Sequence, residues 1–216
     1  MNEEYISTQI SVYKNSKTLL EFHDKLKVAS MYSYAHIHAD GEESEDGWKK
    51  HSLIGILMKD YSSGTGDKSV TVKANISPEE AKFILSRITA GFSEYTFQQE
   101  KIFGTKDSDG YSQVTKVRFI RATKDSKGTV RKMPWYVEVE NGKGIPLKNA
   151  TGGTYMKSGS FVSTGKVYAN LTDLDLYKLL SRVSSYIDCW EKAIAPSLIG
   201  MAKKSMENRK IQQNAA

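Results

Sequence analysis

Residues 72–88 read VKANISPEEAKFILSRI, and residues 167–183 read VYANLTDLDLYKLLSRV. The two segments align without a gap at an offset of 95 positions, and 6 of the 17 aligned residues are identical. Self-similarity at a fixed offset is typical of a repeated structural unit. The sequence therefore predicts that one unit occurs twice in the chain.

Both segments predict a strand followed by a helix. Residues 70–76 alternate apolar with polar side chains, as a half-buried strand does. Ser77 then stands as an N-cap, a proline follows at the first helical position, and Glu80 takes the acidic position of a capping box. The second copy repeats this order, with the alternation in residues 167–171 and Thr172 as the cap. Apolar residues at helical spacing follow each cap, which indicates an amphipathic helix.

Further strand patterns complete each unit. The strands expected in the second unit are Tyr95–Phe103, Gln113–Thr123, Thr129–Glu140 and the one that ends at Leu171. Those expected in the first are Ile6–Tyr13, Lys27–His38, Ser52–Tyr61 and Ser69–Ile76, although Lys17–Ser30 fits a helix equally well. The predicted fold is α+β, with two ββββα repeats over residues 1–94 and 95–195. A polar tail, expected as a frayed helix or as disorder, covers residues 196–216.

Charge and composition narrow the class of protein. The net charge is +6, and residues 101–157 alone contain twelve Lys and Arg against five Asp and Glu. A locally basic segment favours a polyanionic partner. No run of about 18 apolar residues occurs, so no membrane helix is expected. Cys189 is the only cysteine, which excludes an internal disulfide and fits a reducing cytoplasm.

The duplicated strand–helix junctions and the ββββα order resemble the PUR-alpha and Whirly group of single-stranded nucleic-acid binders. The resemblance covers nearly the whole chain at the level of topology and includes no diagnostic motif. It implies two curved antiparallel sheets, each backed by a helix, and a non-catalytic, largely sequence-tolerant protein that binds an unpaired DNA or RNA strand across its open sheet faces. The long connection from Gly142 to Gly165 departs from that pattern.

Basic and aromatic residues on the expected strands are the candidates for such binding, because cations contact phosphates and flat rings stack on bases. If the helix covers the apolar side of the last strand, Lys166 and Tyr168 face away from it. The pattern leaves open whether Lys116 and Arg118 or Arg121 lies on the open side, and whether Trp135 belongs to that side or to the core. The candidate nucleic-acid-binding residues are Lys73, Lys116, Arg118, Arg121, Arg131, Lys132, Trp135, Tyr136, Tyr155, Lys157, Lys166 and Tyr168. A solvated sheet face is the competing interpretation, because exposed faces commonly carry Lys, Arg and Tyr.

Two other classes of function remain open. The triplet His36-Ile37-His38 resembles the metal centre of HUH endonucleases, with His51 or Asp40 as a third ligand, and on a strand both imidazoles would point to one side. A protein–protein adaptor with a basic sheet is the other alternative. The main hypothesis expects neither catalysis nor a cofactor, and open sheet edges favour a homodimer or a higher homo-oligomer.

Overall fold

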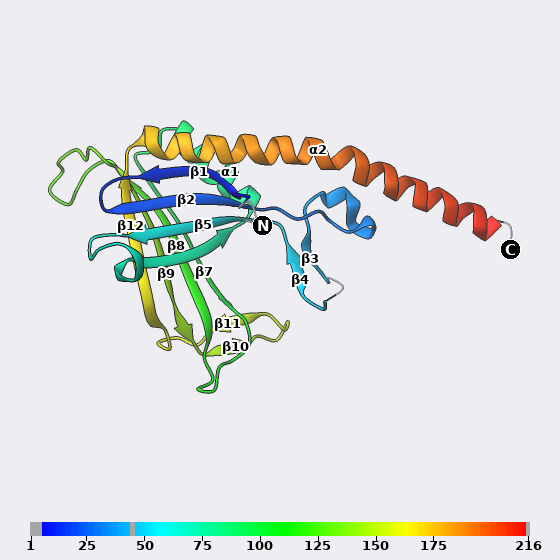
Figure 1. Cartoon of the computed structure of the whole chain (residues 1–216), viewed down its shortest axis with the longest axis horizontal. Helices are drawn as coiled ribbons and strands as arrows, with labels where there is room; N and C mark the ends of the chain where they lie inside the picture. The colour runs from blue at the N-terminus through cyan, green and yellow to red at the C-terminus, as the bar shows by residue number, and fades with distance from the viewer. Residues whose placement is uncertain (1–5, 44–45, 215–216) are drawn as a thin grey trace, which may run out of the picture.

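The protein is an α+β molecule, seen in a computed structural model that describes residues 6–43 and 46–214 (Figure 1). The first sheet contains β1 (Gln9–Lys14), β2 (Thr18–Lys25), β5 (Leu53–Asp60) and β6 (Val70–Ile76), side by side in that order and antiparallel throughout. Helix α1 (Pro78–Thr89) follows β6 directly. A small hairpin of β3 (Asp40–Glu43) and β4 (Lys49–His51) lies between β2 and β5 in the chain.

The second sheet has the order β12-β9-β8-β7 and is also antiparallel. Its strands are β7 (Glu94–Phe103), β8 (Ser112–Ala122), β9 (Trp135–Gly144) and β12 (Val162–Leu171). A short hairpin of β10 (Pro146–Lys148) and β11 (Thr154–Met156) lies between β9 and β12 in the chain. The 42-residue helix α2 (Asp173–Asn214) ends the described chain and extends beyond both sheets (Figure 1).

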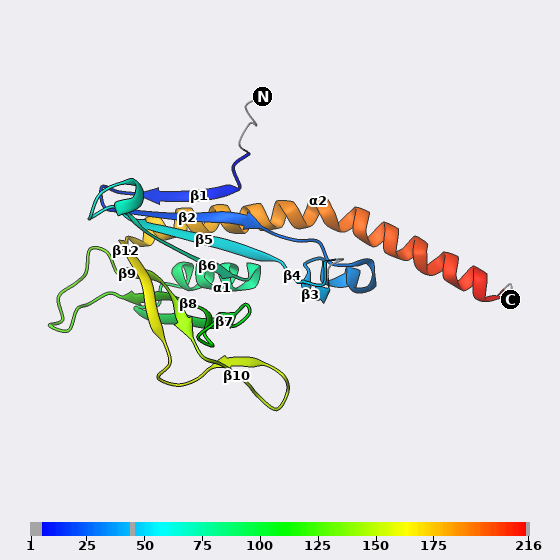
Figure 2. The ribbon, with the colours of Figure 1, turned by 60° about the horizontal axis from the view of Figure 1, so that its bottom comes forward.

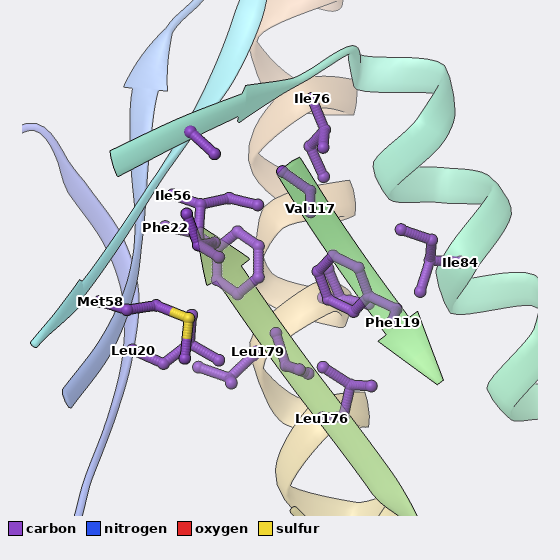
Figure 3. Packing of buried hydrophobic residues seen from close by; sticks show 14 of the residues in the cluster. Leu20, Phe22, Ile56, Met58, Ile76, Ile84, Val117, Phe119, Leu176 and Leu179 are labelled. Carbon is purple, nitrogen blue, oxygen red and sulfur yellow. The ribbon is translucent and has the colours of Figure 1, made fainter. Parts of the chain in front are cut away.

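One hydrophobic core joins the two sheets and both helices. Phe22 and Ile56 of the first sheet point toward Phe119 of the second, with Ile84 of α1 and Leu176 of α2 beside them (Figure 3). Viewed from another side, α1 lies between the two sheets (Figure 2). Each sheet therefore has an inner face in this common core and an outer face turned away from it.

The two helices begin with matching caps. In α1, Ser77 Oγ accepts from Glu80 N at 3.1 Å, and Glu80 Oε2 accepts from Ser77 N at 2.7 Å, which completes the predicted capping box. At the start of α2, Thr172 Oγ1 accepts from Asp175 N at 3.1 Å. Caps of this kind fix where each helix leaves its sheet.

Helix α2 lies along the first sheet, although it follows the last strand of the second. Ser11 Oγ on β1 donates to the Leu179 carbonyl at 3.2 Å, and Tyr186 Oη donates to Asp24 Oδ2 on β2 at 2.8 Å. The expectation that each helix backs its own sheet is therefore corrected for α2. The inner face of β12 packs instead against β6 and its neighbours in the first sheet.

Several predicted elements differ from the structure. The expected strand Lys27–His38 is mainly a loop with a 3-10 helix at Met31–His36, and most of the ambiguous segment Lys17–Ser30 forms β2. The strand predicted from Thr129 begins at Trp135, and it continues through residues 141–144, where the sequence predicts a turn. Helix α2 runs on through residues 196–214, the part of the chain predicted to be a tail.

Candidate nucleic-acid interface

The outer face of the second sheet brings together five of the twelve candidate residues. Val137 and Val139 of β9 are buried, so the alternating residues of β8, β9 and β12 point outward. Cross-strand pairing places these outward residues in three rows: Lys116, Glu140 and Lys166; Arg118, Glu138 and Tyr168; Ile120, Tyr136 and Asn170. We call these nine residues the outer face. The candidates that it unites are Lys116, Arg118, Tyr136, Lys166 and Tyr168.

A buried carboxylate lies at the centre of the outer face. The Glu138 side chain is only 1% exposed, because its neighbours cover it. Arg118 Nη1 lies 2.9 Å from Glu138 Oε1, Lys166 Nζ lies 2.7 Å from Oε2, and Tyr136 Oη also donates to Oε2. Burial by itself would raise the pKa of Glu138. The hydrogen bonds from Lys166 and Tyr136 and the charges of Lys166 and Arg118 outweigh it, and the pKa is lowered. Glu138 is therefore ionised at neutral pH.

Two tyrosine rings lie beside this carboxylate on the outer face. The rings of Tyr136 and Tyr168 stack with their centroids 5.3 Å apart and an interplanar angle of 26°. Tyr168 is 52% exposed, so one edge of the stack is open to a ligand. Burial, and then the hydrogen bond to Glu138, raise the pKa of Tyr136 well above its ordinary value. The pair is an aromatic surface bordered by the cations Arg118 and Lys166.

Lys116 lies at one end of the outer face, where it contacts the loop before β12. Its Nζ lies 3.2 Å from Glu100 Oε2 on β7 and 3.7 Å from the centroid of the Phe161 ring. Phe161 lies against β9 at Gly142, where an added Cβ would come within 2.6 Å of the ring. Glycine is required at this position because a Cβ would collide with this ring and with the backbone carbonyl oxygen of Val162.

Two candidate residues, Arg121 and Trp135, lie on the inner side of the sheet. Trp135 is completely buried, and its Nε1 donates to Asp173 Oδ1 at 2.7 Å. The Arg121 side chain is 10% exposed and holds the same Asp173 with two hydrogen bonds, of 3.0 and 2.9 Å. The structure thus resolves the alternatives left by the sequence: Lys116 and Arg118 face outward, whereas Arg121 and Trp135 fasten the start of α2.

The remaining five candidates lie apart from the outer face. Lys73 is on β6, where its backbone N–H and C=O are held by the Asn141 side chain at 2.9 and 2.7 Å. Arg131 and Lys132 are exposed in the loop between β8 and β9. Tyr155, on β11, lines a cavity of about 580 Å³ beside β7, and Lys157 follows in the next turn. None of these is in the three rows of the outer face.

Sequence reasoning missed Glu138 as the organising residue and counted it only as one acidic charge. The available signal was its position, since Glu138 is two residues from Tyr136 on a strand whose neighbours carry Arg118 and Lys166. Recognising the cluster required the register of three strands, which the sequence does not reveal.

His36 and His38 do not lie on a strand with both imidazoles on one side, as the sequence predicts. His36 ends the 3-10 helix, and Ile37 has a φ of 62°, so the segment is not a strand. His38 lies between Ser52 Oγ at 2.7 Å and Glu191 Oε1 at 3.1 Å, and its ring stacks on Trp190 at 4.9 Å. Within residues 6–43 and 46–214, no three His, Cys, Asp or Glu side chains are grouped to hold a metal ion. His38 instead anchors α2 to the loop before β3.

Comparisons with known proteins add little to this geometry. No protein-family model and no curated protein sequence matches the chain. Among solved structures, the chain is similar to one described as the plant transcriptional regulator PBF-2, with 11% sequence identity and a TM-score of 0.41. The alignment covers 95% of this chain and 89% of the other. A likeness this loose carries no argument about function.

In the described part of the chain, no helix is long and apolar enough to cross a membrane.

Proposed function

We propose that the protein binds single-stranded nucleic acid, without catalysis and with little sequence preference, on the outer face of the second sheet. One observation carries the proposal. Five basic and aromatic residues from separate stretches of sequence lie on three adjacent strands, and two of them, Tyr136 and Tyr168, form a stacked pair in which Tyr168 is exposed. Base stacking on aromatic side chains, with cations nearby for the phosphates, is the usual chemistry of such binding.

The charge on this face indicates which part of the interaction carries the affinity. Lys116, Arg118 and Lys166 are balanced by three carboxylates, those of Glu100, Glu138 and Glu140. A face with little net charge attracts phosphates only weakly over long distances. We therefore assign most of the affinity to stacking on Tyr168 and Tyr136, with phosphate contacts in a supporting role.

The duplicated unit is part of the same proposal. Each four-stranded sheet is followed directly by a helix, and the two helices begin with related caps. We propose that the halves are copies of one unit that diverged in the placement of the helix, with α1 between the sheets and α2 along the first sheet. Divergence also explains why only the second sheet has the ring pair. Assembly into a homo-oligomer in the cytoplasm remains a proposal from the sequence.

A titration of labelled oligo-dT, followed by fluorescence anisotropy at two salt concentrations, tests the function. Replacing Tyr168→Ala should weaken binding by roughly 5- to 150-fold, corresponding to about 1–3 kcal/mol for one stacked base. Tyr177→Ala is the matched control, because Tyr177 is an exposed tyrosine on α2, away from the outer face. Binding that is absent, or that Tyr168→Ala leaves unchanged, contradicts the proposal. Absence of binding would favour the protein–protein adaptor that the sequence leaves open.

A further inference from the structure

Glu138 takes the two cationic donors that a phosphate of a strand bound at the outer face would need. It is an anion, it lies beside the stacked rings, and it takes donors from the two cations that flank them. Arg118 contacts one carboxylate oxygen at 2.9 Å, and Lys166 contacts the other at 2.7 Å. Carboxylate and phosphate groups accept the same charge-assisted hydrogen bonds from Arg and Lys.

We infer that Glu138 is an internal competitor for the phosphate, and that it limits how tightly the outer face holds a strand. The inference rests on the proposed function. A nucleotide whose base stacks on Tyr168 brings its phosphate near Arg118, which is in the same cross-strand row, and near Lys166, two residues away on β12. The phosphate and the carboxylate then need the same donors.

The energetic reason for competition is the burial of Glu138. The side chains of Arg118 and Lys166 are 38% and 44% exposed, so a ligand can reach them, whereas that of Glu138 is 1% exposed. If both cations turned to a phosphate, the buried carboxylate would keep only the Tyr136 hydroxyl as a donor. An ionised group that loses its partners away from water is strongly disfavoured. The strand must therefore bind without full use of these cations.

Removing the charge of Glu138 should release the two cations. In Glu138→Gln the side chain keeps its shape and can still accept from Tyr136, but it no longer holds Arg118 and Lys166 as ion-pair partners. We expect oligo-dT affinity to rise by about tenfold or more, because the competing charge pairs are gone. The slope of log affinity against log salt should also steepen by about 0.7 for each additional phosphate that the protein neutralises.

Glu140→Gln is the matched control for the change in net charge. Glu140 lies two residues further along β9 on the same face, opposite Lys116 and Lys166, and it is half-buried where Glu138 is buried. A general charge effect would raise the affinity equally in both variants. A larger rise and a steeper salt slope in Glu138→Gln alone are the results expected here.

The outcomes separate this inference from the proposed function. Wild-type binding that Glu138→Gln weakens, or raises no more than Glu140→Gln does, overturns the inference and leaves the function standing. If neither the wild type nor either variant binds oligo-dT, both are overturned. Thermal unfolding of each variant shows whether it is folded. If Glu138→Gln does not fold, Glu138→Met takes its place, because methionine fills similar space without a negative charge. If neither replacement folds, Glu138 is structural and the inference is overturned.

Discussion

Neighbouring residues of β9 have opposite surroundings. Trp135 is completely buried and donates to Asp173, whereas the next residue, Tyr136, stacks on Tyr168 at the outer face. Both are aromatic, and both were candidates for base stacking. Successive side chains of a strand point to opposite faces of the sheet, so of these two rings only Tyr136 can contact a ligand at the outer face.

At this scale the two rings should respond differently to mutation. Trp135→Phe removes the N–H donor to Asp173 and leaves a small void, so we expect the free energy of unfolding to fall by about 1–3 kcal/mol. The affinity of the folded variant for oligo-dT should not change. Urea denaturation and anisotropy measure the two quantities. A Trp135→Phe protein that is as stable as the wild type but binds more weakly would show that Trp135 meets the ligand.

The sequence predicts a good part of the residue pattern. Alternation placed Lys166 and Tyr168 opposite the buried Val167 and Ala169, and the structure agrees. It did not decide the side of Trp135, because the partner that fixes this ring is Asp173, 38 residues later. It also did not find Glu138, whose burial depends on side chains from three strands.

At the scale of elements, α2 is the helix that ties the halves together. It begins beside the second sheet, where Arg121 and Trp135 hold Asp173, and it then contacts the first sheet through Tyr186 and the loop before β3 through Trp190. The helix changes direction partway along (Figure 1), and Pro196 within it is the expected cause, since proline removes a backbone hydrogen bond.

Because of the contact between Tyr186 and Asp24, the free energy of unfolding should depend on pH in the alkaline range. Burial, and then the hydrogen bond and charge of Asp24, raise the pKa of Tyr186 to about 12. An unfolded tyrosine titrates near pH 10. The folded state therefore holds the proton more tightly, and its stabilisation is complete below about pH 10 and is lost as the pH rises toward 12.

Tyr186→Phe should remove part of this dependence. At pH 7 we expect a loss of about 0.5–1.5 kcal/mol in the free energy of unfolding, from the missing hydrogen bond. Between about pH 10 and 12 the difference from the wild type should shrink. Urea denaturation across this range measures it, with Tyr177→Phe on the same helix as control. A difference that stays constant with pH would show that this hydrogen bond does not set the titration. Tyr136 and Tyr95, and also Lys82 and Lys143, have raised pKa values and contribute to the dependence that remains.

Local signals predicted some elements and misplaced others. The helix start at Ser77 carries its signal within four residues, so the sequence predicts the first residue of α1 but not its last. Segment Lys27–His38 has apolar residues at strand-like spacing, but β2 takes its place beside β5, because Leu20 and Phe22 fill the core opposite Met58 and Ile56. Which of two competing segments pairs with a strand is a long-range choice that pattern alone does not settle.

At the scale of the whole molecule, the two halves share one core. Phe22 and Met58 come from the first sheet, Val117 and Phe119 from the second, and all four are buried in a single cluster (Figure 3). The predicted boundary near residue 94 therefore separates two sheets that cover each other's apolar faces. Neither sheet buries its inner face alone.

The shared core predicts cooperative unfolding. We expect one transition in urea, with far-UV circular dichroism and tryptophan fluorescence coinciding, as in a two-state protein. A fragment that ends at residue 93 would expose the inner face of the first sheet, and it should lack the cooperative transition. Two separate transitions in the full chain, or a fragment that unfolds cooperatively, would contradict this view of the core.

The central claim, that the outer face of the second sheet binds the strand, is tested most directly by fluorine NMR of protein labelled with 3-fluorotyrosine. Tyr136→Phe and Tyr168→Phe assign the two resonances of interest among the 12 tyrosines. On addition of oligo-dT, we predict that the Tyr136 and Tyr168 resonances shift or broaden, whereas those of Tyr177 and Tyr186 on α2 stay in place. Oligo-dT that binds, as shown by anisotropy, while both outer-face resonances remain unchanged would contradict the claim.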